Sequence, residues 1–217
     1  MITDDDIKIE LASLDEIRDI AMAIRKQVFV EELSIPKNDD LDDNDGPAAH
    51  IIAYIQKQDH KFPVGTMRIR FFGGFVKFER MAVLRNFRKT NVSENIMQYA
   101  YNYVAIKGFR HVSGMCKEEL LPRWQRSGYY VNEKAPITEQ NGMKLISICR
   151  DLPPHPRALT MNSDPKLLIA QEKDLCKDFQ NIQKNPEMKK TPEVQKPTET
   201  NRLLMKIRKF KQKLFNY

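Results

Sequence analysis

Glu79 is the residue of this sequence that is best placed for acid–base chemistry. It lies between Phe78 and Met81 in a run of alternating residues that predicts a strand, so its carboxylate is expected to be partly buried. A carboxylate in such a place can take a proton from an amine, directly or through a water molecule. The structural alternative is an ion pair with Arg68 or Arg70 on the preceding predicted strand. We therefore carry both interpretations of Glu79, a general base and an ion-pair partner.

Residues 88–93 are a second candidate site, because they connect that strand to a predicted helix. The free N–H groups and the dipole at a helix N-terminus favour an anion such as a diphosphate. The side chains of this segment add two positive charges and a hydroxyl. The alternative is an ordinary helix start that is capped by a side-chain hydroxyl. The candidate cofactor-binding residues are Arg88, Lys89, Thr90, Asn91, Val92 and Ser93.

The acidic segment 39–45 has aspartates at a spacing that resembles a calcium loop, but it lacks the glycine and the final glutamate of an EF-hand. We expect a solvated loop, and the alternative is a negative rim that attracts a cationic amine. The four histidines have no metal-ligand spacing, and the three cysteines form no C-x-x-C pair, so no metal site is expected. Cys116 is expected to be a buried structural cysteine.

Residues 201–217 predict a basic amphipathic helix. Leu203, Ile207, Phe210 and Leu214 recur at helical spacing, and six lysines and arginines accompany them without an acidic residue. Such a helix suits an anionic membrane surface or an acidic protein, such as an acyl carrier protein. The alternatives are a helix that packs back on the domain and, less favoured, a nucleic-acid contact, for which no recognition motif is present.

The positive charge of the chain is confined to its C-terminal part. The whole chain has 36 Lys and Arg and 29 Asp and Glu, a net charge of +7. Residues 1–151 contain 22 of each kind, so their net charge is zero, and residues 152–217 contain the other 14 basic and 7 acidic residues. The start of the sequence lacks the basic and apolar pattern of a signal peptide, which predicts a cytoplasmic location. Peripheral attachment to the inner membrane face is the alternative.

Hydrophobic periodicity predicts the order β-α-β-β-β-α-β-α-β-β, an α/β arrangement with a hairpin-rich half and a crossover half. Ser13 and Glu16 form a capping-box pattern before the first helix. Residues 62–65 are expected to be a turn, and Gly73 with Gly74 a hairpin. We divide the chain into a domain of residues 1–151, a proline-containing extension and linker of residues 152–200 with a helix over 164–184, and the basic helix 201–217.

Several short motifs in this order resemble the GNAT superfamily of N-acyltransferases. The segment 25–32, R-K-Q-V-F-V-E-E, is similar to the end of the first helix in one subgroup, and His50 falls where that subgroup has a histidine at the start of the next strand. The segments 64–68, V-G-T-M-R, and 78–83, F-E-R-M-A-V, match two strands. Ser127, Gly128 and Tyr129 stand where the family has x-G-F. The resemblance covers about residues 7–150.

The resemblance implies the GNAT fold, a mixed sheet of six to seven strands with flanking helices, and acetyl-CoA or another acyl-CoA as co-substrate. The strand over 77–84 would diverge from residues 110–115 and leave a cleft for the pantetheine arm. Backbone groups of Met81, Ala82 and Val83 would bind that arm as an added strand does. Residues 88–93 would then hold the diphosphate.

Two positions depart from the family pattern. Asn91 and Ser93 replace small residues of the diphosphate loop, where the backbone must approach the ligand closely. Trp124 stands where many members have a tyrosine that protonates the leaving thiolate, and an indole cannot donate a proton in that way at neutral pH. We expect an N-acyltransferase that moves an acyl group to a primary amine of a small molecule or protein by direct attack. The alternatives are a carrier-protein-dependent acyltransferase and a catalytically degenerate member that acts as a binding or regulatory module.

Overall fold

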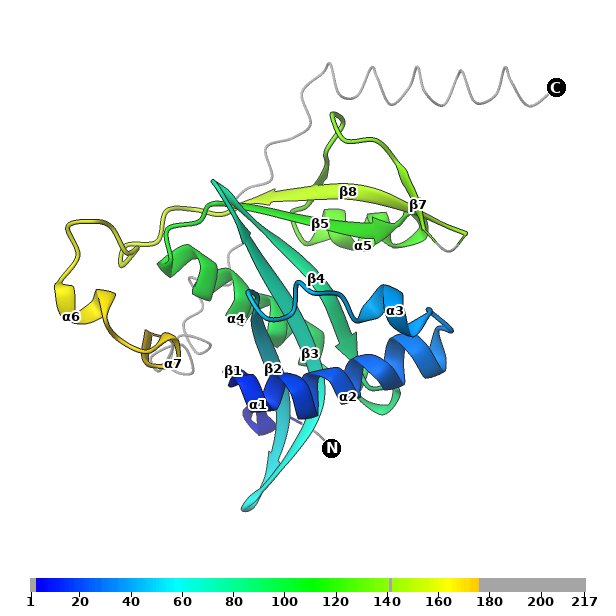
Figure 1. The fold of residues 1–217 in the computed structure, drawn as a ribbon, viewed down its shortest axis with the longest axis horizontal. Helices are drawn as coiled ribbons and strands as arrows, with labels where there is room; N and C mark the ends of the chain where they lie inside the picture. The colour runs from blue at the N-terminus through cyan, green and yellow to red at the C-terminus, as the bar shows by residue number, and fades with distance from the viewer. Residues whose placement is uncertain (1–2, 141, 176–217) are drawn as a thin grey trace.

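The computed structural model describes residues 3–140 and 142–175 (Figure 1). Its centre is an eight-stranded sheet in the order β1-β2-β3-β4-β5-β8-β6, with β7 paired to β8. Strands β4 and β5 are parallel, and the other neighbours are antiparallel. The strands are β1 Ile7–Leu11, β2 Ala49–Lys57, β3 His60–Phe72, β4 Phe75–Val83, β5 His111–Lys117, β6 Tyr130–Val131, β7 Thr138–Gln140 and β8 Met143–Asp151.

The mixed α/β sheet is therefore confirmed, with β7 as a short strand that the periodicity did not predict. The predicted capping box also forms, since Ser13 N donates to the Glu16 carboxylate at 2.8 Å and Glu16 N donates to Ser13 Oγ at 3.3 Å. The π-helical segment Ile17–Ala21 joins α1 to α2, and a second one, Lys26–Glu32, follows α2, so that residues 14–32 form one helical stretch. The helices are α1 Leu14–Glu16, α2 Met22–Arg25, α3 Lys37–Asp40, α4 Val92–Ile106, α5 Leu121–Arg126, α6 Pro165–Leu168 and α7 Glu172–Leu175.

Helices cover both faces of the β1–β4 part of the sheet. Side chains alternate along β2, and Ile51, Ala53 and Ile55 belong to the large core that includes α4. Ile52 and Tyr54 point to the other face, where they form a second cluster with Ala21 of the first helical stretch. This part of the sheet therefore lies between two helical layers, one formed by residues 14–32 and the other by α4.

The predicted turn at residues 62–65 is wrong, because these residues lie inside β3. The chain reverses earlier, between Lys57 and His60, where Gln58 has a positive φ of 52°. Pro63 is tolerated because the register of β2 and β3 shifts next to it, and a bulge does not need every ladder hydrogen bond. The predicted hairpin at Gly73 and Gly74 is confirmed, with Gly74 at φ 100°.

Residues 152–175 pack against the sheet and α4 through both apolar and polar contacts, since Leu152 is part of the main core and Leu159 and Leu175 pack against it. Glu172 accepts hydrogen bonds from Tyr103 Oη at 2.8 Å and Lys107 Nζ at 2.6 Å. The described part of the helix predicted over 164–184 contains the separate short helices α6 and α7 instead of one continuous helix. The rest of that segment and the predicted helix 201–217 lie outside the described residues.

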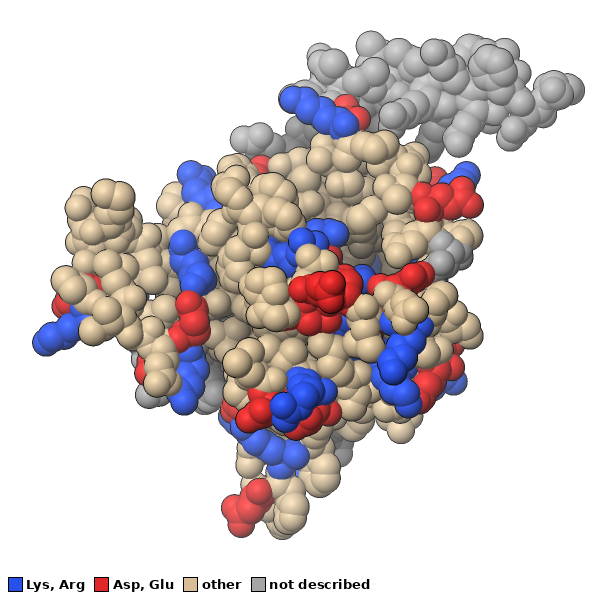
Figure 2. Space-filling view, viewed as in Figure 1, with Lys and Arg blue, Asp and Glu red and all other residues tan. Residues whose placement is uncertain are grey.

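Surface charge on the described residues is mixed. Figure 2 shows basic and acidic side chains next to one another over the visible face, in small groups. This distribution agrees with the equal numbers of acidic and basic residues in positions 1–151. In the described part of the chain, no helix has the length and apolar character needed to cross a membrane.

Candidate active site

The sheet opens between β4 and β5. Their register contains only the pairs Val76–Val112 and Lys77–Ser113, after which the two strands diverge (Figure 1). A cavity of about 380 Å³ fills the opening, with Phe78 and Met81 on its β4 side and Gly114 on its β5 side. We call it the inter-strand cavity. The predicted divergence of residues 77–84 from 110–115 is thus present, and it leaves one backbone edge of β4 without a neighbouring strand.

A β-bulge lies in β4 at this opening. Glu79 pairs with Arg68 and Ala82 with Thr66, so that Arg80 and Met81 together face a single residue, Met67. Arg80 adopts φ 54°, the left-handed region that is uncommon for residues other than glycine. Strain of this kind persists only where the surroundings enforce it, and it is frequent at functional sites. The enforcing contacts here include the hydrogen bond from Arg80 Nη2 to the Asp39 carbonyl at 2.7 Å.

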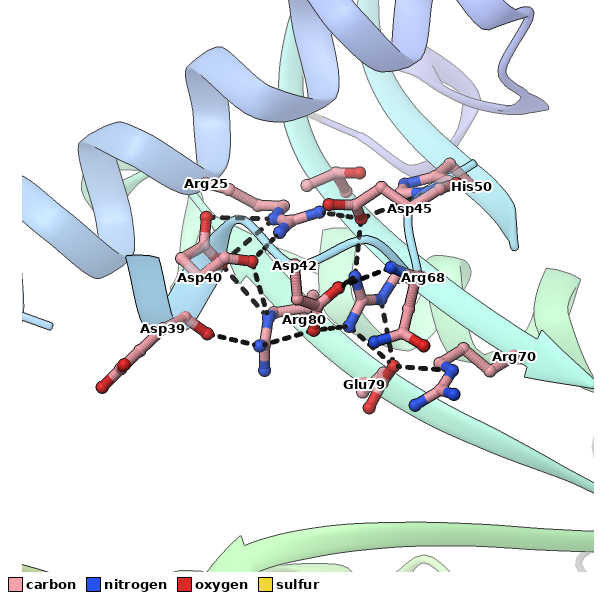
Figure 3. Close-up of polar contacts among 12 residues, drawn as sticks. Arg25, Asp39, Asp40, Asp42, Asp45, His50, Arg68, Arg70, Glu79 and Arg80 are labelled. Carbon is pink, nitrogen blue, oxygen red and sulfur yellow. Dashed lines mark hydrogen bonds and ion pairs between the residues drawn. The ribbon is translucent and has the colours of Figure 1, made fainter. Parts of the chain in front are cut away.

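Three arginines bind the acidic loop next to the bulge (Figure 3). Arg25, which is fully buried, pairs with Asp40 at 3.1 Å and with Asp45 at 2.5 Å. Arg68 reaches Asp45 at 2.7 Å, and Arg80 reaches Asp40 at 3.2 Å. The prediction of a solvated loop at residues 39–45 is therefore wrong for the aspartates that form these ion pairs. The tertiary structure brings arginines from three separate elements against this loop.

Glu79 has the ion-pair environment that was one of its two predicted interpretations. Its Oε1 lies 2.8 Å from Arg68 Nη2, and its Oε2 lies 2.9 Å from Lys77 Nζ. Arg70 Nε is more distant, at 3.9 Å. Both carboxylate oxygens are thus engaged, although Glu79 also lines the inter-strand cavity. In a base role, Glu79 would take the proton on a lone pair that these ion pairs leave open.

The network changes the acid–base properties of its members. The guanidinium of Arg68, hydrogen-bonded at 2.5 Å, holds the pKa of Asp42 well below its usual range. Burial lowers the pKa of His50, whose Nε2 lies 3.2 Å from the Asp45 carbonyl oxygen. Among the described residues, His50 Nδ1 is buried without a hydrogen-bond partner. Both shifts disfavour protonation in the folded state.

We predict that Asp42→Asn destabilises the protein at pH 7 and that its difference from the wild type in free energy of unfolding narrows as the pH falls below about 4. Because the folded pKa of Asp42 lies below the unfolded value of about 3.9, the stabilisation is present above that value and is lost as the pH falls through the folded pKa. Urea unfolding of both proteins at pH 7, 5, 3 and 2 measures the difference. A difference that is the same at pH 5 and at pH 2 would show that the ion pair with Arg68 does not cause it.

The predicted diphosphate loop makes several contacts within the protein. Arg88 Nε donates to the Val83 carbonyl at 2.9 Å, and the Arg88 guanidinium pairs with Glu32. Thr90 Oγ1 donates to the Phe87 carbonyl at 2.6 Å and accepts from Val92 N at 3.4 Å. The hydroxyl of Thr90 therefore contacts the helix start, while Lys89 is exposed.

Asn91 and Ser93 occupy different places in this loop. Asn91 has φ −79°, so it does not use the left-handed conformation that glycine would favour, and its Nδ2 binds Asp4 at 2.8 Å. Ser93 lines a second cavity, of about 250 Å³, between the start of α4 and α5. Arg123 donates to Ser93 Oγ at 3.4 Å there. We call this second space the helix-side cavity.

The two cavities share part of their walls. Met81, Met97 and Trp124 line both of them, so a ligand that spans both spaces would pass these three side chains. Of the predicted cofactor-binding residues, Met81 and Ser93 line a cavity. Ala82 and Val83 pair with β3 on one side and follow the divergence point, whereas Arg88, Lys89, Thr90, Asn91 and Val92 form the loop beside it.

Sequence reasoning missed a buried group next to Trp124. Tyr101 Oη donates to Tyr129 Oη at 3.1 Å, and the guanidinium carbon of Arg150 lies 4.3 Å from the centre of the Tyr101 ring. Burial raises the pKa of Tyr129 well above its usual value, so its phenol keeps its proton. Trp124 packs edge-on against Tyr129, with ring centres 5.2 Å apart. The helical periodicity of α4 could have suggested that Tyr101 is buried, but nothing local links it to Tyr129.

Comparison with known proteins supports an acetyltransferase class. No protein-family model matches the chain. The chain is 34% identical over 113 residues to the Bacillus subtilis (strain 168) protein named "Putative acetyltransferase BSU40680", which covers 51% of this chain and 70% of that protein. The crystal structure of a "putative N-acetyltransferase" from Lactobacillus plantarum superposes with a TM-score of 0.60 at 22% identity, over 67% of this chain and 98% of that one.

A second similar structure is BjaI, a CoA-dependent acyl-homoserine lactone synthase determined with SAM and isopentyl-CoA. It has a TM-score of 0.52 at 16% identity, over 67% of this chain and 83% of its own. At such sequence identities the two structures show a common fold, which is the GNAT-like mixed α/β fold. Because the chain is 34% identical to the Bacillus subtilis relative and covers 70% of it, the chain belongs to the same family, that of acetyltransferases.

The described residues fit a coenzyme A thioester. The helix-side cavity combines the first turn of α4 with Arg123, Arg126 and Arg150, which suits the phosphates. Arg150 Nε is buried and has no hydrogen-bond partner among the described residues, so a donor there is left for a ligand or water. The free edge of β4 suits the amide-containing pantetheine arm. No group of three or more His, Cys, Asp or Glu side chains is placed to hold a metal ion in the described part of the chain.

Proposed function

We propose that this protein is an acyl-CoA-dependent N-acyltransferase that acylates a primary amine by direct attack. The observation that carries the proposal is the opening between β4 and β5, where the bulge at Arg80 and Met81 lies beside the junction of the two cavities. A thioester that enters from the helix-side cavity would bring its reactive end to this bulge. Backbone groups of a bulge do not all pair within the ladder and can bind a ligand.

The reaction transfers one acyl group between two nucleophiles. The amine nitrogen forms a bond to the carbonyl carbon, the carbon–sulfur bond breaks, the nitrogen loses a proton and the sulfur gains one. Glu79 would accept the first proton on a lone pair that its ion pairs with Arg68 and Lys77 leave open. Tyr129 carries the single hydroxyl among the described side chains that line the inter-strand cavity. We assign to Tyr129 the second proton transfer on its position, because it lines the cavity and Tyr101 Oη donates to its oxygen.

The helix-side cavity gives a direct test of cofactor binding. We expect wild-type protein to bind acetyl-CoA with a micromolar Kd in a calorimetric titration. Ser93→Trp should weaken binding at least about tenfold, because the indole would fill the space beside Arg123 where the phosphates are expected.

Thr138→Trp is the matched control, since Thr138 is exposed on β7 and lines neither cavity. It should bind acetyl-CoA as the wild type does. If Ser93→Trp and Thr138→Trp lose affinity for acetyl-CoA equally, this cavity is no longer supported as the cofactor site. No binding by the folded wild-type protein to acetyl-CoA or to longer acyl-CoA donors would overturn the proposed function.

A second candidate function is a non-catalytic binding module of the same family. The engagement of both Glu79 oxygens favours it, because the expected base is not free. This alternative predicts acyl-CoA binding without transfer to any amine in a panel of small amines and lysine peptides. Release of free CoA thiol in the presence of an amine would favour the N-acyltransferase, and no release would favour the binding module.

The partner of segment 201–217 and the location of the protein are also proposals. Its pattern suits an anionic membrane surface or an acidic partner such as an acyl carrier protein, which would be an alternative acyl donor. Each basic residue near anionic lipid contributes about 1 kcal/mol. We expect the full chain to sediment with anionic vesicles and the chain that ends at residue 200 to remain in solution. Equal sedimentation of the two would exclude this role of the segment.

A further inference from the structure

We propose that the transferred acyl group is an unbranched aliphatic chain longer than acetyl, and that the inter-strand cavity holds it. This inference rests on the proposed function and names the donor for that site. The cavity measures about 380 Å³. The methyl of an acetyl group is about the size of one water molecule, which takes ~30 Å³ in the liquid. Beside an acetyl group, space would therefore remain for the end of the pantetheine arm at the β4 edge and for a longer acyl chain.

The lining of the inter-strand cavity is mainly apolar and adaptable. Five of the ten methionines of the chain line it, together with apolar residues of α5, β8 and the first helical stretch. Methionine is unbranched and flexible, so such walls can adjust to a hydrocarbon chain. The five methionines are Met67, Met81, Met97, Met115 and Met143.

The deep wall of the cavity explains why its occupant should be the acyl chain. Met67, Phe78, Met97 and Ile148 line it and are at most 9% exposed, so they reach into the protein core. An amine acceptor with polar groups would lose its hydration at such a wall without gaining hydrogen bonds. An acyl chain starts at the buried thioester carbon, and it would be stabilised by the same wall.

Charge in the cavity is balanced within the protein. Asp40 is bound by Arg25 and Arg80, and Glu79 is bound by Arg68 and Lys77. Such a lining has no net charge to attract a polycationic amine or a charged acyl group. The charged residues of the lining are three acidic and three basic, namely Asp39, Asp40, Glu79, Lys77, Arg80 and Lys117.

The mouth of the inter-strand cavity exposes apolar side chains to solvent. Leu33, Met115 and Leu120 line the cavity and are 48%, 38% and 43% exposed. Large apolar side chains that gather at a concave site are typical of ligand contacts. An acyl chain that extends beyond the deep wall would contact these side chains and shield them from solvent.

The test is a calorimetric titration of the full chain with acetyl-, butanoyl-, hexanoyl- and octanoyl-CoA, which needs no acceptor. The Kd should fall about three- to fourfold for each added methylene that is buried, so hexanoyl-CoA should bind about 100-fold more tightly than acetyl-CoA. If acetyl-CoA binds and longer chains bind no better, the inference is wrong and the proposed function stands. If no thioester binds, the proposed function itself fails.

Gly114→Val tests where the chain binds. A Cβ at Gly114 would lie 3.5 Å from the Phe78 carbonyl oxygen and 3.8 Å from Ile148 Cγ1, which are ordinary contacts, and the two Cγ atoms of valine extend beyond it and should narrow the cavity. It should reduce the advantage of octanoyl-CoA over acetyl-CoA at least about tenfold.

Gly73→Val is the matched control, because a Cβ there meets nothing within 4 Å. It should bind octanoyl-CoA more tightly than acetyl-CoA by the same factor as the wild type does. If Gly114→Val also keeps this factor, the acyl chain binds elsewhere and the inference is wrong. If Gly114→Val does not fold, the chain-length series with the wild-type protein still decides the question.

Discussion

Replacing Arg68 with methionine should lower the free energy of unfolding by about 3–5 kcal/mol. The Arg68 side chain is almost fully buried and contacts three carboxylates, those of Asp42, Asp45 and Glu79. Methionine fills much of the same volume but leaves these partly buried charges without their main partner. Removing one member of a buried ion-pair network is costly because the others lose their compensation, even though the complete network need not add much stability.

Arg70→Met is the control for Arg68→Met, since Arg70 is more exposed and lies 3.9 Å from Glu79. Its effect should be within about 1 kcal/mol, as for other exposed ion pairs. Chemical denaturation at pH 7 measures both variants. Similar losses in the two would mean that the network around Arg68 is not specially coupled to the fold. The Arg68 variant also tests whether this ion-pair network supports the bulge, because Arg68 pairs with Glu79 directly beside Arg80.

Tyr129→Phe should lower kcat about 100-fold at a nearly unchanged KM for the acyl donor. The ring and its packing against Trp124 remain, and only the hydroxyl that is proposed to protonate the sulfur is lost. Steady-state release of the thiol in the presence of an amine measures the effect. Tyr101→Phe should have a smaller effect, about tenfold, because Tyr129 keeps its hydroxyl but loses the partner at 3.1 Å.

Tyr130→Phe is the control for the tyrosine prediction. Tyr130 is next in the chain but is exposed and binds Asp151 at 3.1 Å, so its loss should leave kcat unchanged. A purely structural role of Tyr129 can be separated by a second readout. The loss in Tyr129→Phe should shrink with a thioester of a more acidic thiol, which can leave without a proton. An equal loss with both thioesters would contradict the proton-transfer role.

Most of the fold could be predicted from local patterns. The alternation in residues 75–84 and the helical periodicity in residues 91–107 correspond to β4 and α4, since burial on one face imposes those periods on the sequence. The turn at residues 62–65 was predicted wrongly, because Pro63 usually marks a turn and the bulge that accommodates it depends on β2. The short strand β7 has no apolar alternation of its own, and its pairing depends on β8.

The sequence by itself determined most of the elements and their order and pointed to the family, because these depend on periodicity, capping and short motifs within continuous segments. It also singled out Glu79 and offered Arg68 or Arg70 on the neighbouring strand as its ion-pair partner, and the structure places Arg68 nearer, at 2.8 Å. Only the tertiary structure decided the state of the acidic loop. Arg25, Arg68 and Arg80 come from three elements and meet there through packing.

The tertiary structure also decided the shape of the candidate site. Tyr101 lies on α4, Tyr129 follows α5 and Arg150 lies on β8, so no spacing in the sequence reports that they are neighbours. The opening of the sheet likewise depends on how far β5 follows β4, and the two strands pair at only two positions. Contacts between distant segments are fixed by the whole core, and a one-dimensional pattern does not contain them.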